Sequence, residues 1–464
     1  MYDPETPLLS GELKVTVYDR FTRAQKRSII GIIAWAGLIP YFLLGSVIPA
    51  IPQIATELQA TPAAVSLSIS FSTIASALGS LFWGSYSSHY GRRPVYLASV
   101  PCVILGSLGS GLATTLPELF LWRFIQAFGA GSALSVGTAV VGDIYTTEER
   151  GTAMGMFLAV QLIGPAVAPL GGGIAAHYAS WRHMQYILCV ASILTLILSS
   201  AFLPETSHPG SRGMDQTGAS KRKIVFINPL RSLRLLRSPA MMLVCVVASL
   251  TLLSDFVLWV PLPYTVGARY GITNEALVGA CFLPCGLGNL VGAPIAGSVS
   301  DKIIKKLRAK RGGKSIPEDR IRGTEFGSFF LVPASVLLAG AASQYVDGPL
   351  GIVLNLVALF MNGVGAVFVL APLSAYVVDI LRENSAEAAA ATNGMRTFLC
   401  ALMTTGIMPC LDRYGVMWTN VVAAVLAWVA YGLLLCIMRY GDALRGSVDI
   451  GFSKEENESS YEHE

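Results

Sequence analysis

The sequence predicts an all-α integral membrane protein with twelve transmembrane helices in two six-helix bundles. Only 13% of its 464 residues are charged and 53% are hydrophobic, whereas soluble domains carry about 25% charged residues. A chain so poor in charge cannot cover a water-facing surface, so most of its surface must face lipid. A short loop beginning Gly84-Ser-Tyr-Ser recurs as Gly297-Ser-Val-Ser, each time after an apolar run. This repeat predicts two halves related by duplication.

Twelve apolar runs have the length of roughly 20 residues that a spanning helix needs. They cover about 29–49, 63–83, 94–113, 118–142, 151–175, 182–203, 239–263, 275–299, 326–346, 349–378, 388–410 and 415–438. The tenth run is overlong, so we expect it to tilt or to start late. The runs are continuous and do not alternate polar with apolar residues, which argues against a membrane β-barrel.

The spans divide the chain into five regions. We expect a cytoplasmic segment over 1–28, a first bundle over 29–203, a cytoplasmic linker over 204–238, a second bundle over 239–438 and an acidic cytoplasmic tail over 439–464. The polar, acidic start lacks the order of a secretory signal, so the first span is expected to direct insertion.

Lysine and arginine predict the orientation, because they concentrate in cytoplasmic loops. Five of the 33 precede the first span, seven lie in 204–238 and nine lie near 300–325, whereas the opposite side holds only Arg182, Arg269 and Arg413. Both termini are therefore expected in the cytoplasm. The basic residues are spread over inner loops, where they anchor against anionic lipid, so we predict a bilayer and no nucleic acid as partner.

Two aspartates repeat the duplication. Val141-Gly-Asp143 ends the fourth span and Val377-Val-Asp379 ends the tenth, and each follows the repeated loop of its half by two spans. The fourth spans of the two halves therefore correspond. This is a parallel repeat, as in transporters whose halves are related by an axis along the membrane normal.

Four motifs resemble those of the major facilitator superfamily, in particular its twelve-helix drug:proton antiporter group in the fungal form. They are the loop from Gly84 to Arg93, the stretch Arg123-Phe-Ile-Gln-Ala-Phe-Gly129, the run Gly164-Pro165-Ala-Val-Ala-Pro-Leu-Gly-Gly172 and the triplet Pro204-Glu205-Thr206. The resemblance covers almost the whole chain. It implies two bundles that rock around a central cavity, small-molecule cargo, and no cofactor or catalytic residue.

The resemblance also implies gating residues at the cytoplasmic side. These are Gly84, Arg92, Arg93 and, in the second half, Asp301. Ser88 and His89 stand where the family has an acid and an arginine, so a standard first-half latch is not expected, and Asp143 is the acid left for Arg92 or Arg93. The alternative is a loop whose charges only hold it at the cytosolic face.

The pair Gly164-Pro165 lies inside the fifth span. Proline frees backbone carbonyls and bends a helix, and small residues let helices approach closely. A bendable, closely packed helix between two halves suits rocking, so both residues are assigned to gating. The alternative is packing alone.

Charged residues inside spans are the sharpest functional signals, because burying them in lipid is costly. Arg123 has Gln126 one turn further on, Arg396 has Asn393 one turn earlier, and Asp255 lies in the middle of the seventh span. Each must face a cavity or a partner, and a structural ion pair is the alternative. We expect the two arginines and their amide neighbours to line the cavity, together with the further amides of Asn289 and Gln161.

Asp255 is predicted to couple protons to transport. Burial disfavours the charged form of a carboxyl group and a nearby arginine favours it, so such a group can titrate between two facing states. The eight cysteines lie in or beside apolar runs, with no CxxC spacing and no accompanying histidine. They are expected to pack as small hydrophobes, and no metal site is predicted.

The sequence holds no HExxH, GxSxG or phosphate-binding loop, so we predict a gradient-driven transporter and not an enzyme or an ATPase. Two intramembrane arginines against one aspartate favour acidic cargo. The resemblance includes fungal exporters of secreted metabolites and dicarboxylic acids such as itaconate, and such export is the predicted function. The alternatives are a broad multidrug or polyamine:proton antiporter and, because of Ser88, a receptor-like protein that has stopped transporting.

We expect a monomer in the plasma membrane. The start Pro4-Glu-Thr-Pro-Leu-Leu9 resembles a vacuolar sorting signal, so a vacuolar or other internal membrane is the alternative.

Overall fold

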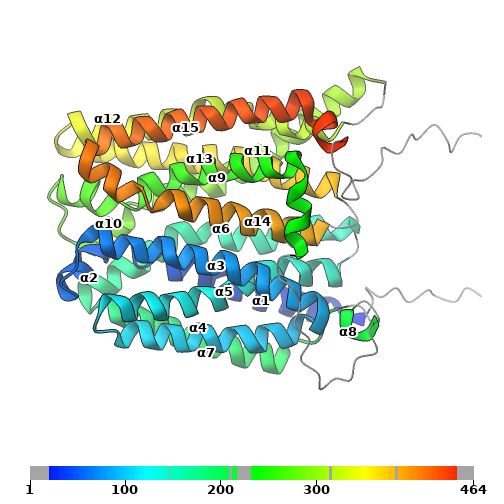
Figure 1. Ribbon diagram of the computed structural model, residues 1–464, viewed down its shortest axis with the longest axis horizontal. Helices are drawn as coiled ribbons and strands as arrows, with labels where there is room; N and C mark the ends of the chain where they lie inside the picture. Colours follow the sequence, from blue (N-terminus) through cyan, green and yellow to red (C-terminus); the bar gives the residue numbers. More distant parts are fainter. Residues whose placement is uncertain are drawn as a thin grey trace, which may run out of the picture.

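The computed structural model describes residues 20–145, 147–207, 212–216, 231–312, 316–381 and 385–446. Every regular element within these ranges is helical, which confirms the predicted fold class. Residues 447–464 of the predicted acidic tail and the Pro4 signal lie outside the described residues, whereas 439–446 continue helix α15 (Ile407–Gly446). Figure 1 shows long helices running side by side across the molecule.

The first half contains the six predicted spans and one short helix. The elements are α1 (Arg23–Gly45), α2 (Ile51–Glu57), α3 (Pro62–Tyr90), α4 (Arg92–Leu112), α5 (Leu116–Ile144), α6 (Thr147–Tyr178) and α7 (Trp181–Phe202). Helices α1 and α5 begin with capping boxes, in which a threonine and the third helical residue satisfy each other's free N–H groups. Gly91, at φ +105°, makes the sharp turn between α3 and α4, a conformation that favours glycine.

The second half is more broken. A short helix α8 (Gly213–Gln216) and a 3₁₀ segment η2 (Arg231–Arg237) precede α9 (Pro239–Trp259). The remaining elements are η3 (Pro263–Ala268), α10 (Glu275–Ala280), α11 (Leu283–Lys310), η4 (Pro317–Thr324), η5 (Gly327–Leu331), α12 (Val332–Tyr345), α13 (Gly348–Ile380), α14 (Ser385–Thr404) and α15 (Ile407–Gly446).

Ten described helical segments are long and apolar enough to cross a membrane. The helices α6 and α14, of 32 and 20 residues, lie where the fifth and eleventh spans were predicted. The chain breaks twice near the predicted boundary between the last two spans, and the second break, at Gly415, lies where that boundary was predicted. Helix α14 ends at Thr404, a new helix starts at Ile407, and Gly415, at φ +79°, interrupts it. The overlong tenth run is one helix, α13, of 33 residues.

The two halves meet chiefly along three helix pairs. Helix α3 packs on α14, and α6 packs on α10 and α11. We call the two ends of the bundle the α2 end, where α2 and α10 lie, and the α8 end, where α8 lies (Figure 1).

The α2 end is closed by one apolar cluster that draws on both halves. Ile48 and Ile51 from the first half share this cluster with Phe256, Phe282 and Cys400 from the second. The other apolar clusters among the described residues each belong to a single half. The halves are therefore joined most extensively at the α2 end.

Candidate functional site

The first-half loop carries an ion pair at the α8 end. Arg92 donates from Nε to Asp143 Oδ2 at 2.8 Å and from a terminal nitrogen to Ser87 Oγ at 2.7 Å. Thr206 also donates to Asp143. All of these partners belong to the first half. Ser88 is exposed, and its hydroxyl reaches only Gly84 O, at 3.4 Å. Arg92 of this loop is thus paired with Asp143, although position 88 holds no acid.

The start of α4 is capped by Glu205. Its two carboxylate oxygens accept hydrogen bonds from the backbone N–H groups of Arg92 and Arg93, at 2.9 and 3.2 Å. A carboxylate at a helix N-terminus meets unpaired N–H groups and the positive end of the helix dipole. The Arg93 side chain donates to Ser200 O. Sequence reasoning identified Glu205 only as part of a motif and missed this role.

The second half repeats the ion pair with a different element. Arg320 on η4 donates from Nε to Asp379 Oδ2 at 2.6 Å, and its terminal nitrogen lies 3.9 Å from Asp301 Oδ1. Asp379 corresponds to Asp143, so Arg320 corresponds to Arg92. Sequence reasoning missed Arg320, although the run Asp319-Arg-Ile-Arg-Gly323 repeats the basic pair beside a glycine.

Arg396 lines a small pocket among α9, α13 and α14 in the second half. Asn393 lines the same pocket, so the structure brings these two predicted residues together. The Arg396 Nε is buried and has no hydrogen-bond partner among the described residues. Tyr41 on α1, from the first half, lies close enough to interact electrostatically with Arg396. The pocket therefore lies near the contact between the halves.

Asp255 on α9 is 5% exposed. Its Oδ1 has no hydrogen-bond partner, and no ion pair joins it to another described residue. The thiols of Cys285 and Cys400 lie within its electrostatic reach, and that of Cys400 also lies within reach of Arg396. A buried carboxyl group without a basic partner does not match the structural ion pair considered as the alternative.

Arg123 is buried among helices of the first half. Its guanidinium donates to Ser72 Oγ and to Leu43 O, both at 3.2 Å, and Nη1 has no partner among the described residues. Gln126 donates to Ser107 and Gln185 at 2.8 and 3.0 Å. These last partners lie on α4 and α7, so Gln126 closes a polar network inside the first bundle and is not brought to Arg396.

The remaining predicted residues are dispersed. Gln161 on α6 is 5% exposed and its Nε2 has no partner in the described chain. Gly164 packs on Tyr41, because a Cβ at position 164 would lie 2.7 Å from the Tyr41 Cβ. Pro165 follows inside α6. Asn289 is buried on α11, beside Gly363 of α13.

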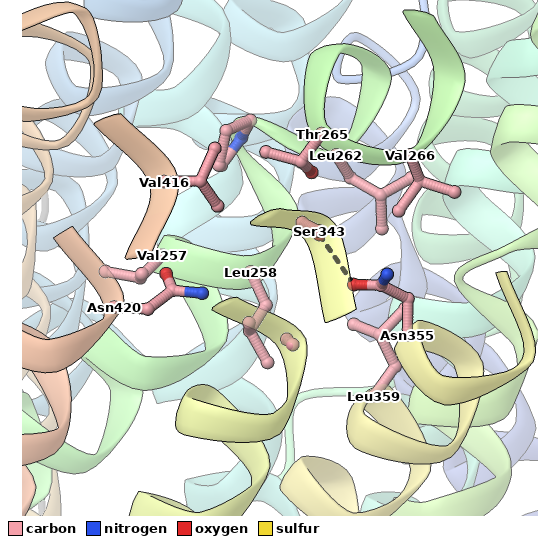
Figure 2. Close-up of a pocket in the computed structure, with 12 residues that line it drawn as sticks. Val257, Leu258, Leu262, Thr265, Val266, Ser343, Asn355, Leu359, Val416 and Asn420 are labelled. Carbon is pink, nitrogen blue, oxygen red and sulfur yellow. Dashed lines mark hydrogen bonds between the residues drawn. The ribbon is translucent and has the colours of Figure 1, made fainter. Parts of the chain in front are cut away.

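A second small pocket lies toward the α2 end of the second half. Asn355 and Asn420 face it, and Ser343 donates to Asn355 Oδ1 at 3.0 Å (Figure 2). None of the predicted site residues lines it, and it contains no charged side chain. It therefore offers no charge to an ionic cargo.

Two helical bundles that enclose buried, unpaired charges define a multi-pass membrane transporter. The family model described as Major Facilitator Superfamily matches residues 33–405. The chain belongs to this family, so it is a secondary transporter and not an enzyme.

Curated relatives are fungal transporters. Efflux pump radE of Floropilus chiversii is 25% identical over 418 residues, which cover 86% of this chain and 77% of that protein. Citrate exporter 1 of Aspergillus niger is 25% identical over 466 residues, covering 92% of this chain and 88% of that protein. MFS antiporter QDR3 of Candida albicans is 33% identical, but only over 181 residues and 39% of this chain.

Solved structures show the same fold. The xylose transporter XylE from E. coli, in a partially occluded inward-open conformation, matches with a TM-score of 0.63 at 15% identity, covering 90% of this chain and 98% of that one. The human organic anion transporter MFSD10 matches with a TM-score of 0.58 at 16% identity, covering 88% of this chain and 99% of that one. At such identities the likeness concerns the fold alone.

Proposed function

We propose that this transporter exports a small organic acid or acidic secreted metabolite, an itaconate-like dicarboxylate being favoured, in exchange for protons. The observation that carries the proposal is the unpaired, buried Nε of Arg396 in a pocket near the contact between the halves. A guanidinium offers a carboxylate two parallel hydrogen bonds, which an ammonium cannot match. The likeness to a citrate exporter supports acidic cargo.

Asp255 is the proposed proton carrier. Its carboxyl group is buried and unpaired, and it shares Cys400 as a neighbour with Arg396. A carboxyl group at this place can gain a proton when the carrier faces one side and lose it when the carrier faces the other. Arg123, Gln161, Asn289 and Asn393 remain proposed cavity residues, whereas Gln126 is engaged inside the first bundle.

The experiment is transport of labelled itaconate by purified protein in vesicles with an imposed pH gradient. We expect Arg396→Lys to reduce itaconate transport at least tenfold at unchanged protein level, because one good charge-assisted pair contributes on the order of 1.5–3 kcal/mol. Arg413→Lys is the matched control, since Arg413 is exposed on α15. Unchanged transport of the native cargo by Arg396→Ala would refute the cargo role.

The second candidate is a multidrug or polyamine:proton antiporter. It is favoured by the local likeness to an antiporter and by the unpaired carboxyl group of Asp255, which could hold a cation. Competition with spermidine in the same vesicles separates the two candidates. Spermidine transport that survives Arg396→Ala and is lost in Asp255→Asn would select the antiporter.

We further propose that the α8 end faces the cytoplasm, that the α2 end faces outward and that the chain works as a plasma-membrane monomer. The support is the lysine and arginine asymmetry, since Arg182, Arg269 and Arg413 lie toward the α2 end, whereas the described basic residues of η2, of 302–311 and of η4 lie toward the α8 end. With that orientation the structure is closed outward. Accessibility of single cysteines placed in α2 and in η4, probed in intact cells, tests the orientation.

A further inference from the structure

The second-half loop contains a segment that the first-half loop lacks. Gly84 to Ser88 aligns with Gly297 to Asp301. In the first half, helix α3 ends two residues after Ser88, at Tyr90, and Arg92 follows at once. In the second half, α11 continues nine residues past Asp301 to Lys310, and the corresponding Arg320 arrives only on η4. We call the extra helical segment, residues 302–310, the basic arm.

The basic arm extends beyond the hydrocarbon layer. Helix α11 has 28 residues, or roughly 42 Å at 1.5 Å per residue, whereas the hydrocarbon core is about 30 Å thick. Because the arm follows the Asp301–Arg320 contact at the α8 end, this length places the arm on the cytoplasmic side of the lipid tails in the proposed orientation. Its end at Lys310 lies roughly 12 Å beyond Lys302, because eight residues separate them. The arm thus spreads its lysines over that distance along the helix axis.

Four exposed lysines lie on the basic arm. They form a helical ladder, three, one and four positions apart along the chain, and comprise Lys302, Lys305, Lys306 and Lys310. The apolar side chains Ile303, Ile304 and Leu307 are only half-exposed. Two acids at this end lie beside arginines, since Asp301 lies 3.9 Å from Arg320 and Asp319 binds Arg311 and Arg322. The ladder therefore keeps its positive charge.

We propose that the basic arm is a docking site for the headgroup of a polyphosphorylated inositol lipid. A serine headgroup carries one net charge at the bilayer surface, whereas phosphates on an inositol ring project further from it. A ladder of lysines that rises roughly 12 Å matches the projecting phosphates. Each lysine near an anionic surface contributes to such binding. The inference uses the proposed cytoplasmic placement of the α8 end and no feature of cargo transport.

The test measures binding, not transport, so its failure leaves the proposed function untouched. The full-length protein, purified in detergent, is titrated with dioctanoyl phosphatidylinositol bisphosphate and with dioctanoyl phosphatidylserine at 0.15 M salt. We expect saturable binding of the inositol lipid, and at least tenfold weaker binding of the serine lipid. Lys302→Gln/Lys306→Gln should weaken binding of the inositol lipid about 10- to 30-fold.

The matched control is Arg23→Gln/Arg27→Gln. It removes two exposed cations, also four residues apart, from the start of α1 at the same end of the bundle. We expect this variant to bind within twofold of the wild type. Equal losses of affinity in the two double variants, or equal affinity for the two lipids, would mean that binding depends on overall positive charge and not on the basic arm. Either result would overturn the proposal. So would unchanged binding by Lys302→Gln/Lys306→Gln.

The acidic tail is the other possible occupant, since residues 455–464 hold five glutamates. It follows Arg445, whose ion pair with Glu318 on η4 fixes its starting point near the arm. If the inositol lipid binds only after residues 447–464 are removed, the tail occupies the arm in the full-length chain and the lipid proposal fails.

Discussion

The contact between α6 and α11 sets how firmly the α2 end is closed. These helices belong to different halves, and Gly286 lets them touch. A Cβ at position 286 would lie 2.1 Å from the Cβ of Ala166, whereas ordinary contact begins at 3.4 Å. Gly286→Ala therefore requires the helices to separate by about 1.3 Å, the difference between these distances.

Such overpacking costs typically about 1–3 kcal/mol. Because it affects only the closed contact, it should lower the ratio of closed to open α2 end about 5- to 140-fold. The assay is the rate at which maleimide labels Cys400 as the sole cysteine. This residue is 1% exposed within the apolar cluster that spans both halves. We expect faster labelling in Gly286→Ala.

Gly432→Ala is the control for this experiment. A Cβ at position 432, inside α15, would meet nothing within 4 Å. Both substitutions bring a similar local gain in helix propensity, of roughly 1 kcal/mol, so their difference isolates the clash. An unchanged labelling rate in Gly286→Ala, or the same increase in both variants, would refute the reasoning that glycine contact holds this end shut.

Three further predictions concern charges. Asp255→Asn should abolish the dependence of transport on an imposed pH gradient, and a variant that still concentrates cargo with the same pH dependence would make Asp255 structural. Ser88→Asp should favour closure of the α8 end by only about 0.2–1 kcal/mol, because the position is exposed. Cysteine labelling from each side that is identical in the wild type and in Ser88→Asp would contradict a weakened latch. Arg320→Gln should lower the melting temperature in detergent more than Arg322→Gln, since Arg320 lies 2.6 Å from Asp379 and Arg322 lies 3.8 Å from its acid.

Hydropathy and repetition predicted the fold because a lipid environment constrains span length and backbone hydrogen bonding so strongly. The same repetition pointed to Asp143 and Asp379. It did not reveal Arg320. In the second half this arginine lies further from the repeated loop than Arg92 does in the first half, because extra residues separate them, so a search at the same spacing does not find it. The break between Thr404 and Ile407, inside the predicted eleventh span, was also missed, since hydropathy does not record backbone conformation.

The candidate site was predictable in its residue types more than in its geometry. Arg396 and Asp255 were predicted as site residues because they are charged residues inside spans, where burying a charge is energetically costly. Spacing could not tell that Gln126 bonds inside its own bundle, or that Tyr41 reaches Arg396 from the other half. Such contacts depend on how helices rotate about their axes, which the pattern of one helix does not specify.

The cap on α4 has a mechanical consequence. Glu205 stands at the start of the segment that connects the two halves, and Arg20 donates to the carbonyl groups of Glu205 and Ser207. The first residues of the connection are thereby fastened to the first bundle and travel with it as one rigid piece. Only the part of the connection that follows Ser207 therefore determines how far one bundle can rotate relative to the other. Shortening the connection after Ser207, and not at Glu205, would limit the angle through which the bundles rotate relative to each other.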